Sequence, residues 1–158
     1  MKKSLAPRNV EGFSLVEVLV FTVVLGMFFV AAISVTVFNL KNMKIQEHKI
    51  LATRYAEEAI EWVKQEKEDN WTDFIEKDTS AVIPSSGTTY CLNDDSPSWD
   101  SSFPCESYGL NAIFKREIVI RNSGVPDVNL VEVELTVYWE DMGTDLSVTI
   151  KNVFKLLE

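Results

Sequence analysis

An apolar run dominates the first quarter of the chain. Every residue from Val18 to Ile33 is apolar or small except Thr22, and the mainly apolar flanks 13–16 and 34–40 lengthen the run. A helix that crosses a bilayer needs roughly 20 such residues. Apolar side chains occur on every side of the helical wheel, so the segment has no polar face. The pattern therefore predicts a membrane-spanning helix.

An amphipathic helical pattern follows the apolar run. Charged residues cover one side of it, and the other side carries a stripe at helical spacing, formed by Ala52, Ala56, Ala59 and Val63. No proline interrupts the chain between Pro7 and Pro84. We therefore expect one nearly continuous helix from about Phe13 to Glu68, with its first half in the membrane and its second half packed on a domain core.

The last third of the chain has the pattern of an antiparallel sheet. β-Branched and aromatic residues fill 113–121, 128–139 and 146–157, and apolar and polar residues alternate most clearly from Val131 to Trp139. The connections are too short for a helical crossover. The region between the helix and these strands is rich in loop formers. We predict an α+β fold in which the amphipathic helix covers the sheet.

The chain has 158 residues, enough for one small domain beside the apolar helix. Its formal net charge of −9 makes nucleic acid an unsuitable partner, since phosphate binding requires clustered basic residues. The basic residues Lys2, Lys3 and Arg8 precede the apolar run and favour a cytoplasmic N-terminus. Lysines at 41, 44 and 49 on the other side reduce that asymmetry.

Glu17 is an acid inside the N-terminal end of the apolar run. An unpaired carboxylate in lipid costs on the order of 2–3 kcal/mol or more, so this residue needs either a position among the headgroups or a charged partner. It follows the segment Gly12-Phe13-Ser14-Leu15-Val16, which itself comes after a short basic leader. In these residues the sequence resembles the type IV prepilin family.

The resemblance implies a processing site and an assembly contact. In that family a membrane peptidase cuts after the glycine on the cytoplasmic side, and the new N-terminal residue is methylated, which here places cleavage between Gly12 and Phe13 and methylation on Phe13. Glu17 then lies four residues from the new ammonium group, on the same helical face. By family implication this carboxylate pairs with the N-terminal amine of a neighbouring subunit.

The resemblance also implies an organisation and a set of partners. Residues 1–12 are the leader, 13–40 the transmembrane and assembly half of the helix, and 41–158 the extracytoplasmic domain. The partners are the prepilin peptidase, other pilin-like subunits and an assembly platform driven by an ATPase. The absence of a proline in the apolar half favours a minor pilin or pseudopilin. Type IV pilus, type II secretion and competence systems share these features, and the choice among them stays open.

Two other interpretations compete with this one. A conventional secretory signal would be cut after the apolar region, where Ala31-Ala32 is a poor site, and it leaves Gly12, Phe13 and Glu17 without a role. A single-pass membrane protein with an extracytoplasmic ligand-binding domain would retain the helix and enter no filament.

The two cysteines, Cys91 and Cys105, lie in the loop-rich region. A single pair in an extracytoplasmic domain is typical of one disulfide. Free thiols that bind a metal would need further ligands or a closer spacing. We therefore expect a Cys91–Cys105 bond.

Residues for catalysis are scarce, and we expect a structural protein that is not an enzyme and has no cofactor. His48 is the only histidine, and its charged neighbours indicate a solvated surface position. Glu140-Asp141 lies in an expected turn, where acids are common. A calcium site is a weaker alternative to ordinary loop chemistry, and its oxygen ligands would come from Asn93, Asp94, Asp95 and Asp100.

Overall fold

The computed structural model describes residues 12, 14–80, 86–99, 103–122 and 130–155. The chain divides into two compact units, the first ending at Met43 and the second beginning at Lys44. Each unit is considered separately below.

Helix α1 (Leu15–Asp69) is a single helix of 55 residues. It begins and ends within two residues of the predicted helix, although Phe13 itself lies outside the described residues. The absence of proline explains its continuity, because a proline inside a helix removes a hydrogen bond and clashes with the preceding turn. Residues 15–43 form the described helix of the first unit, and the remainder of α1 belongs to the second unit.

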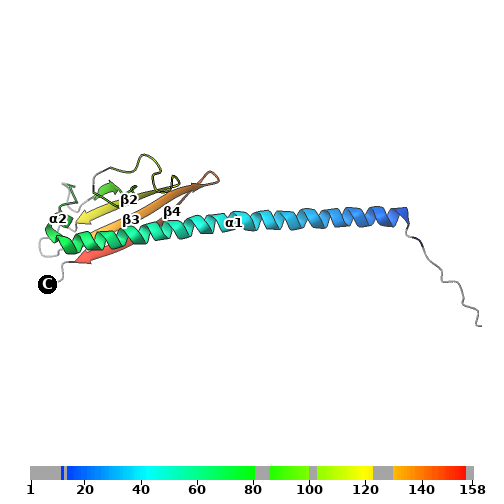
Figure 1. Cartoon of the computed structure of the whole chain (residues 1–158), viewed down its shortest axis with the longest axis horizontal. Coiled ribbons are helices and arrows are strands. Elements are labelled where there is room, and N and C mark those ends of the chain that lie inside the picture. Colours follow the sequence, from blue (N-terminus) through cyan, green and yellow to red (C-terminus); the bar gives the residue numbers. More distant parts are fainter. Residues whose placement is uncertain (1–11, 13, 81–85, 100–102, 123–129, 156–158) are drawn as a thin grey trace, which may run out of the picture. The chain divides into compact units, whose positions relative to one another are not determined.

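The second unit contains a four-stranded antiparallel sheet in the order β1-β2-β3-β4 (Figure 1). The strands are β1 (Thr88–Cys91), β2 (Phe114–Asn122), β3 (Leu130–Asp141) and β4 (Thr144–Lys155). Three of them confirm the predicted strands, and β1 is an additional one. Each strand pairs with the next in sequence, so short connections suffice. The α+β prediction is confirmed.

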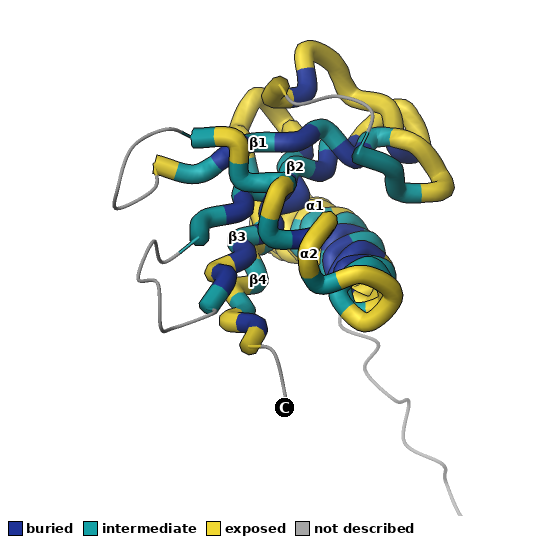
Figure 2. The backbone as a smooth tube through the Cα atoms, turned by 90° about the vertical axis from the view of Figure 1, so that its left-hand side faces the viewer, coloured by how far each residue is buried: buried dark blue, intermediate teal, exposed yellow. Residues whose placement is uncertain are grey.

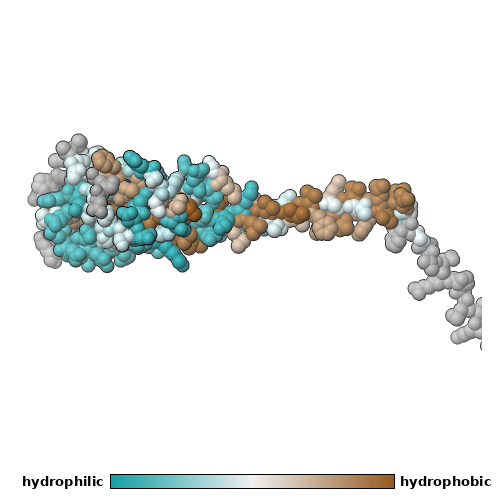
Figure 3. Space-filling view, turned by 45° about the horizontal axis from the view of Figure 1, so that its top comes forward, coloured by the Kyte–Doolittle hydropathy of each residue, from teal (hydrophilic) through white to brown (hydrophobic). Residues whose placement is uncertain are grey.

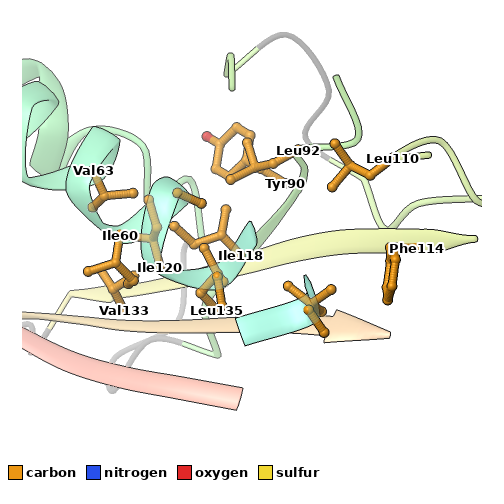
Figure 4. Close-up of a cluster of buried hydrophobic side chains, with 14 of the residues drawn as sticks. Ile60, Val63, Tyr90, Leu92, Leu110, Phe114, Ile118, Ile120, Val133 and Leu135 are labelled. Atoms are coloured by element: carbon orange, nitrogen blue, oxygen red, sulfur yellow. The ribbon is translucent and has the colours of Figure 1, made fainter. Parts of the chain in front are cut away.

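The core lies between the sheet and the part of α1 that follows Leu51 (Figure 2). The predicted stripe on α1 is fully buried at Ala52, Ala56, Ala59 and Val63. The inward face of β3 is equally buried, at Val131, Val133, Leu135, Val137 and Trp139. Figure 4 shows Ile60 and Val63 of the helix over side chains of the strands. Small alanines bring the helix backbone close to the sheet, and each large apolar side chain buried there contributes roughly 1.5–3 kcal/mol.

The β3–β4 connection is shorter than the predicted loop of residues 140–145. Asp141 pairs with Thr144, and only Met142 and Gly143 lie between the strands, with φ angles of 51° and 76°. Two consecutive positive φ angles are typical of the tight hairpin turn that matches the twist of the flanking strands. Glu140 and Asp141 therefore belong to β3 and not to a turn. The predicted connection at 122–127 lies mostly outside the described residues.

Two short elements link α1 to the sheet. Helix α2 (Trp71–Ile75) begins after Asn70, whose Oδ1 accepts hydrogen bonds from the backbone N–H groups of Thr72 and Asp73. It places Phe74 in the core. On β1, the Tyr90 hydroxyl donates to the carbonyl of Lys77 at 2.6 Å. Burial raises the pKa of Tyr90, and the nearby charge of Asp78 adds to this effect.

Glu134 joins three strands on the outer face of the sheet. Its carboxylate lies 2.9 Å from Arg121 Nη1 on β2 and 2.9 Å from Lys151 Nζ on β4. Hydrogen bonds from Lys151 and then Arg121 lower the pKa of the Glu134 carboxyl below its ordinary value. A carboxyl with a lowered pKa stabilises the fold above its unfolded-state pKa, and this contribution is lost as the pH falls through the folded-state pKa.

We therefore expect Glu134→Gln to lower the free energy of unfolding at pH 7 by about 0.5–1 kcal/mol, a value limited by the partial exposure of the pair. The difference from wild type should shrink as the pH falls below about 4. Denaturation of the full chain in detergent micelles, followed by tryptophan fluorescence, measures this effect, because all four tryptophans lie beyond residue 44. Glu132→Gln, on the same face of β3 but exposed, is the control. Equal losses at pH 7 and pH 3 would contradict the expectation.

Candidate functional site

The N-terminal part of α1 exposes a long and mainly apolar surface. Every residue from 15 to 40 is exposed, and apolar side chains cover this segment in Figure 3. At roughly 1.5 Å per residue it is about 39 Å long, against about 30 Å for the hydrocarbon core of a bilayer. Soluble proteins rarely expose apolar patches of such extent. By length and composition, α1 can cross a membrane, which is consistent with a membrane anchor.

The hydroxyl groups in this segment bond to the helix itself. Thr22 Oγ1 donates to the carbonyl of Leu19 at 2.9 Å, Ser34 Oγ to Val30 at 2.9 Å and Thr36 Oγ1 to Ala32 at 3.0 Å. A polar group in lipid must be satisfied internally, so these bonds make the three side chains compatible with an apolar environment.

Glu17 differs from these side chains. It lies in the first turn of α1, where its backbone N–H donates to the carbonyl of Ser14 at 3.0 Å. It is the only charged residue between 15 and 40. Its side chain is exposed, and no cation among the described residues lies within ion-pair distance. The positive end of the helix dipole favours a carboxylate here, but a lipid environment would still require a partner of opposite charge.

Gly12 lies just before the helix, in a non-helical and exposed position. A Cβ added to it would meet no atom within 4 Å. The glycine is therefore not required by packing within the described part of the chain. Residues 1–11 and Phe13 lie outside the described residues, so the predicted leader, cleavage and methylation remain predictions.

Arg116 stabilises the fold, and the sequence patterns described above do not single it out. Its side chain is fully buried in β2 and donates to three backbone carbonyls, those of Leu92 at 2.9 Å, Tyr55 at 2.9 Å and Asp94 at 3.1 Å. Burial lowers the pKa of the guanidinium, and the Glu58 carboxylate, 3.8 Å away, opposes this. Arg116 thus ties α1 and the loop after β1 to the sheet. The inward register shared with Phe114 and Ile118 could have identified it from sequence.

Cys91 and Cys105 form a disulfide with a Cα–Cα distance of 4.9 Å, which confirms the predicted pairing. The bond joins the end of β1 to the loop before β2. The backbone N–H of Cys105 also donates to Glu117 Oε1 at 3.0 Å. The disulfide and Arg116 both fix the loop region against the sheet. The loop region needs such links because it contributes few residues to the core.

We expect the double variant Cys91→Ser with Cys105→Ser to lose about 3 kcal/mol of unfolding free energy, because the bond closes a loop over 14 positions and restricts the unfolded chain. Denaturation of the full chain in detergent measures the loss. Reductant should destabilise wild type by a similar amount and leave the variant unaffected. An unchanged midpoint in the variant would contradict this role.

The remaining candidate residues from the sequence are His48 and the possible calcium ligands. The prediction that His48 is solvated is wrong, since its side chain is only 18% exposed and lies 3.3 Å from Asp141. For the calcium alternative, Asn93 Oδ1 already accepts the Arg116 N–H at 2.9 Å, and Asp100 lies outside the described residues. Within the described ranges, no group of three or more His, Cys, Asp or Glu side chains is placed to hold a metal ion.

Comparison of the chain with protein-family models, curated proteins and solved structures finds no match in any of the three.

Proposed function

We propose that this protein is a structural subunit of a type IV pilus-like filament, a minor pilin or pseudopilin that assembles through α1. The observation that carries the proposal is the position of Glu17. This carboxylate is the only charge in the exposed, mainly apolar segment 15–40 of α1, it lies in the first turn, and no described cation lies within ion-pair distance of it. A helix that served only as an anchor would not require a charge at this position.

The proposed assembly step joins Glu17 to a neighbouring subunit. Cleavage after Gly12 creates an ammonium group on Phe13, one helical turn from Glu17. In a bundle of apolar helices, the carboxylate of one subunit and the ammonium group of the next neutralise each other, so that neither charge remains alone in an apolar environment. The apolar surface of residues 15–40 supplies the contact area between subunits.

The proposed location follows from the same features. The basic leader stays at the cytoplasmic face, where the prepilin peptidase acts, and the sheet domain lies outside the cytoplasmic membrane. The Cys91–Cys105 disulfide supports an oxidising compartment for this domain. The partners are the peptidase, other pilin-like subunits, and the assembly platform with its ATPase.

Substitution of Glu17 tests this function. Glu17→Leu is expected to insert into the membrane normally and to enter filaments roughly tenfold less than wild type, since about 1.4 kcal/mol of lost pairing corresponds to that factor. The measurement compares the chain in membrane and filament fractions of its native cells. Thr22→Val, which removes an internally bonded hydroxyl from the same helix, is the control and should assemble normally. Normal incorporation of Glu17→Leu would refute the pairing role, whereas absence of the wild-type chain from filaments would favour the single-pass ligand-binding alternative.

A further inference from the structure

His48 and Asp141 meet at one end of the core. His48 lies on α1, and Asp141 is the last residue of β3, where it closes the β3–β4 hairpin by pairing with Thr144. His48 Nδ1 lies 3.3 Å from Asp141 Oδ2, and the two side chains are only 18% and 10% exposed. The imidazole also packs edge-on against Phe114, with ring centroids 6.0 Å apart.

The two facing atoms are buried polar groups that lack hydrogen bonds. Neither Nδ1 nor Oδ2 forms one with any described residue. A buried polar atom without a hydrogen bond destabilises the fold, so such a pair requires an explanation. A proton on Nδ1 would bond to the carboxylate and satisfy both atoms. When the only imidazole proton is on Nε2, two acceptors face each other instead.

The surroundings leave Asp141 as the main charge that faces the imidazole. On α1, Glu47 is exposed and paired with Lys44 at 3.0 Å. On β2 the facing group is the uncharged ring of Phe114. On β3 the inward neighbour of Asp141 is Trp139, whose buried Nε1 forms no hydrogen bond with any described residue. Among the described residues, Asp141 is the carboxylate within ion-pair distance of His48.

We propose that His48 and Asp141 form a pH-sensitive latch that holds the β3–β4 hairpin against α1. The imidazolium form carries protons on both ring nitrogens, so Nδ1 donates to Asp141 and the opposite charges attract. The neutral form loses the charge attraction and loosens the hairpin next to Phe114. Histidine changes its charge between pH 5 and 8, a range that an extracytoplasmic domain meets directly. The latch does not depend on the filament role, so the failure of either proposal leaves the other unaffected.

Hydrogen exchange of the full chain in detergent micelles tests the latch. After correction for the intrinsic exchange rate, the amides of residues 137–148 should be roughly fivefold better protected at pH 5.5 than at pH 8 in wild type. His48→Gln and Asp141→Asn should remove this pH dependence. Asp145→Asn, an exposed acid on the same hairpin with the same change of charge, should retain it.

The proposal is overturned if His48→Gln keeps the pH dependence of wild type. Should either variant fail to fold, nitrogen-15 spectra of wild type decide, since the chain has a single histidine and its two ring nitrogens give one pair of signals. A protonated Nδ1 that exchanges slowly with water at pH 5.5 supports the latch. An Nδ1 without a proton, or with one that exchanges freely, refutes it.

Discussion

Gly12→Val is expected to abolish removal of the leader in cells that contain prepilin peptidase. The proposed cleavage needs an extended backbone at Gly12, and a β-branched side chain both stiffens that backbone and fills space in the protease cleft. The described part of the chain does not oppose the substitution, because a Cβ at this exposed position meets none of its atoms within 4 Å. Loss of processing would therefore arise from the peptidase and not from misfolding.

Electrophoretic mobility with and without co-expressed peptidase measures the effect, since cleavage removes twelve residues. Gly26→Val is the matched control: Gly26 lies within the apolar helix, and its added Cβ also meets no atom within 4 Å. This variant should be processed as wild type. If Gly12→Val and wild type are processed to the same extent, cleavage does not occur after Gly12.

Arg116→Met is expected to be the most damaging single substitution in the sheet domain, with a loss of about 2–4 kcal/mol of unfolding free energy. Methionine fills part of the volume but donates no hydrogen bond. The buried carbonyl of Leu92 then loses a charged donor, and an unsatisfied buried acceptor costs roughly 1–3 kcal/mol. The bonds to the less buried carbonyls of Tyr55 and Asp94 are lost as well. Arg116→Lys should recover little, because an ammonium group lacks the planar fork that reaches three carbonyls.

Denaturation of the full chain in detergent, followed by tryptophan fluorescence, provides the measurement. Arg54→Met is the control, since Arg54 is exposed on α1 beside Tyr55 and its loss should change stability by no more than about 0.5 kcal/mol. If both variants unfold at the same denaturant concentration, Arg116 does not have the role that its contacts indicate.

The fold could be predicted largely from sequence because its main elements have strong periodic patterns. The stripe from Ala52 to Val63 and the alternation from Val131 to Trp139 each identify one buried face, and both faces form the core. Strand β1 and helix α2 were missed because elements of four and five residues are too short to show a period. Their positions depend on tertiary contacts such as the bond from Tyr90 to Lys77.

The polar residues of the core were harder to predict than the apolar ones. Arg116 carries a signal, since it occupies an inward position of β2, but the carbonyls that it binds come from segments 22 to 61 residues away. His48 gave the wrong indication because its charged neighbours along α1 face solvent, whereas its own side chain lies on the face toward Phe114 and Asp141. Glu17 could be singled out from sequence alone, since a charge in an apolar run needs no tertiary information.

We propose that cleavage after Gly12 produces a mature chain whose N-terminus lies just before α1. Intact-mass and fragment-ion mass spectrometry of the protein purified from its native cells measures that N-terminus directly. We expect a chain that starts at Phe13 with a methyl group on its amine and retains the apolar helix. A chain that keeps its leader in cells with active peptidase, or one cut after Ala31-Ala32, would contradict it.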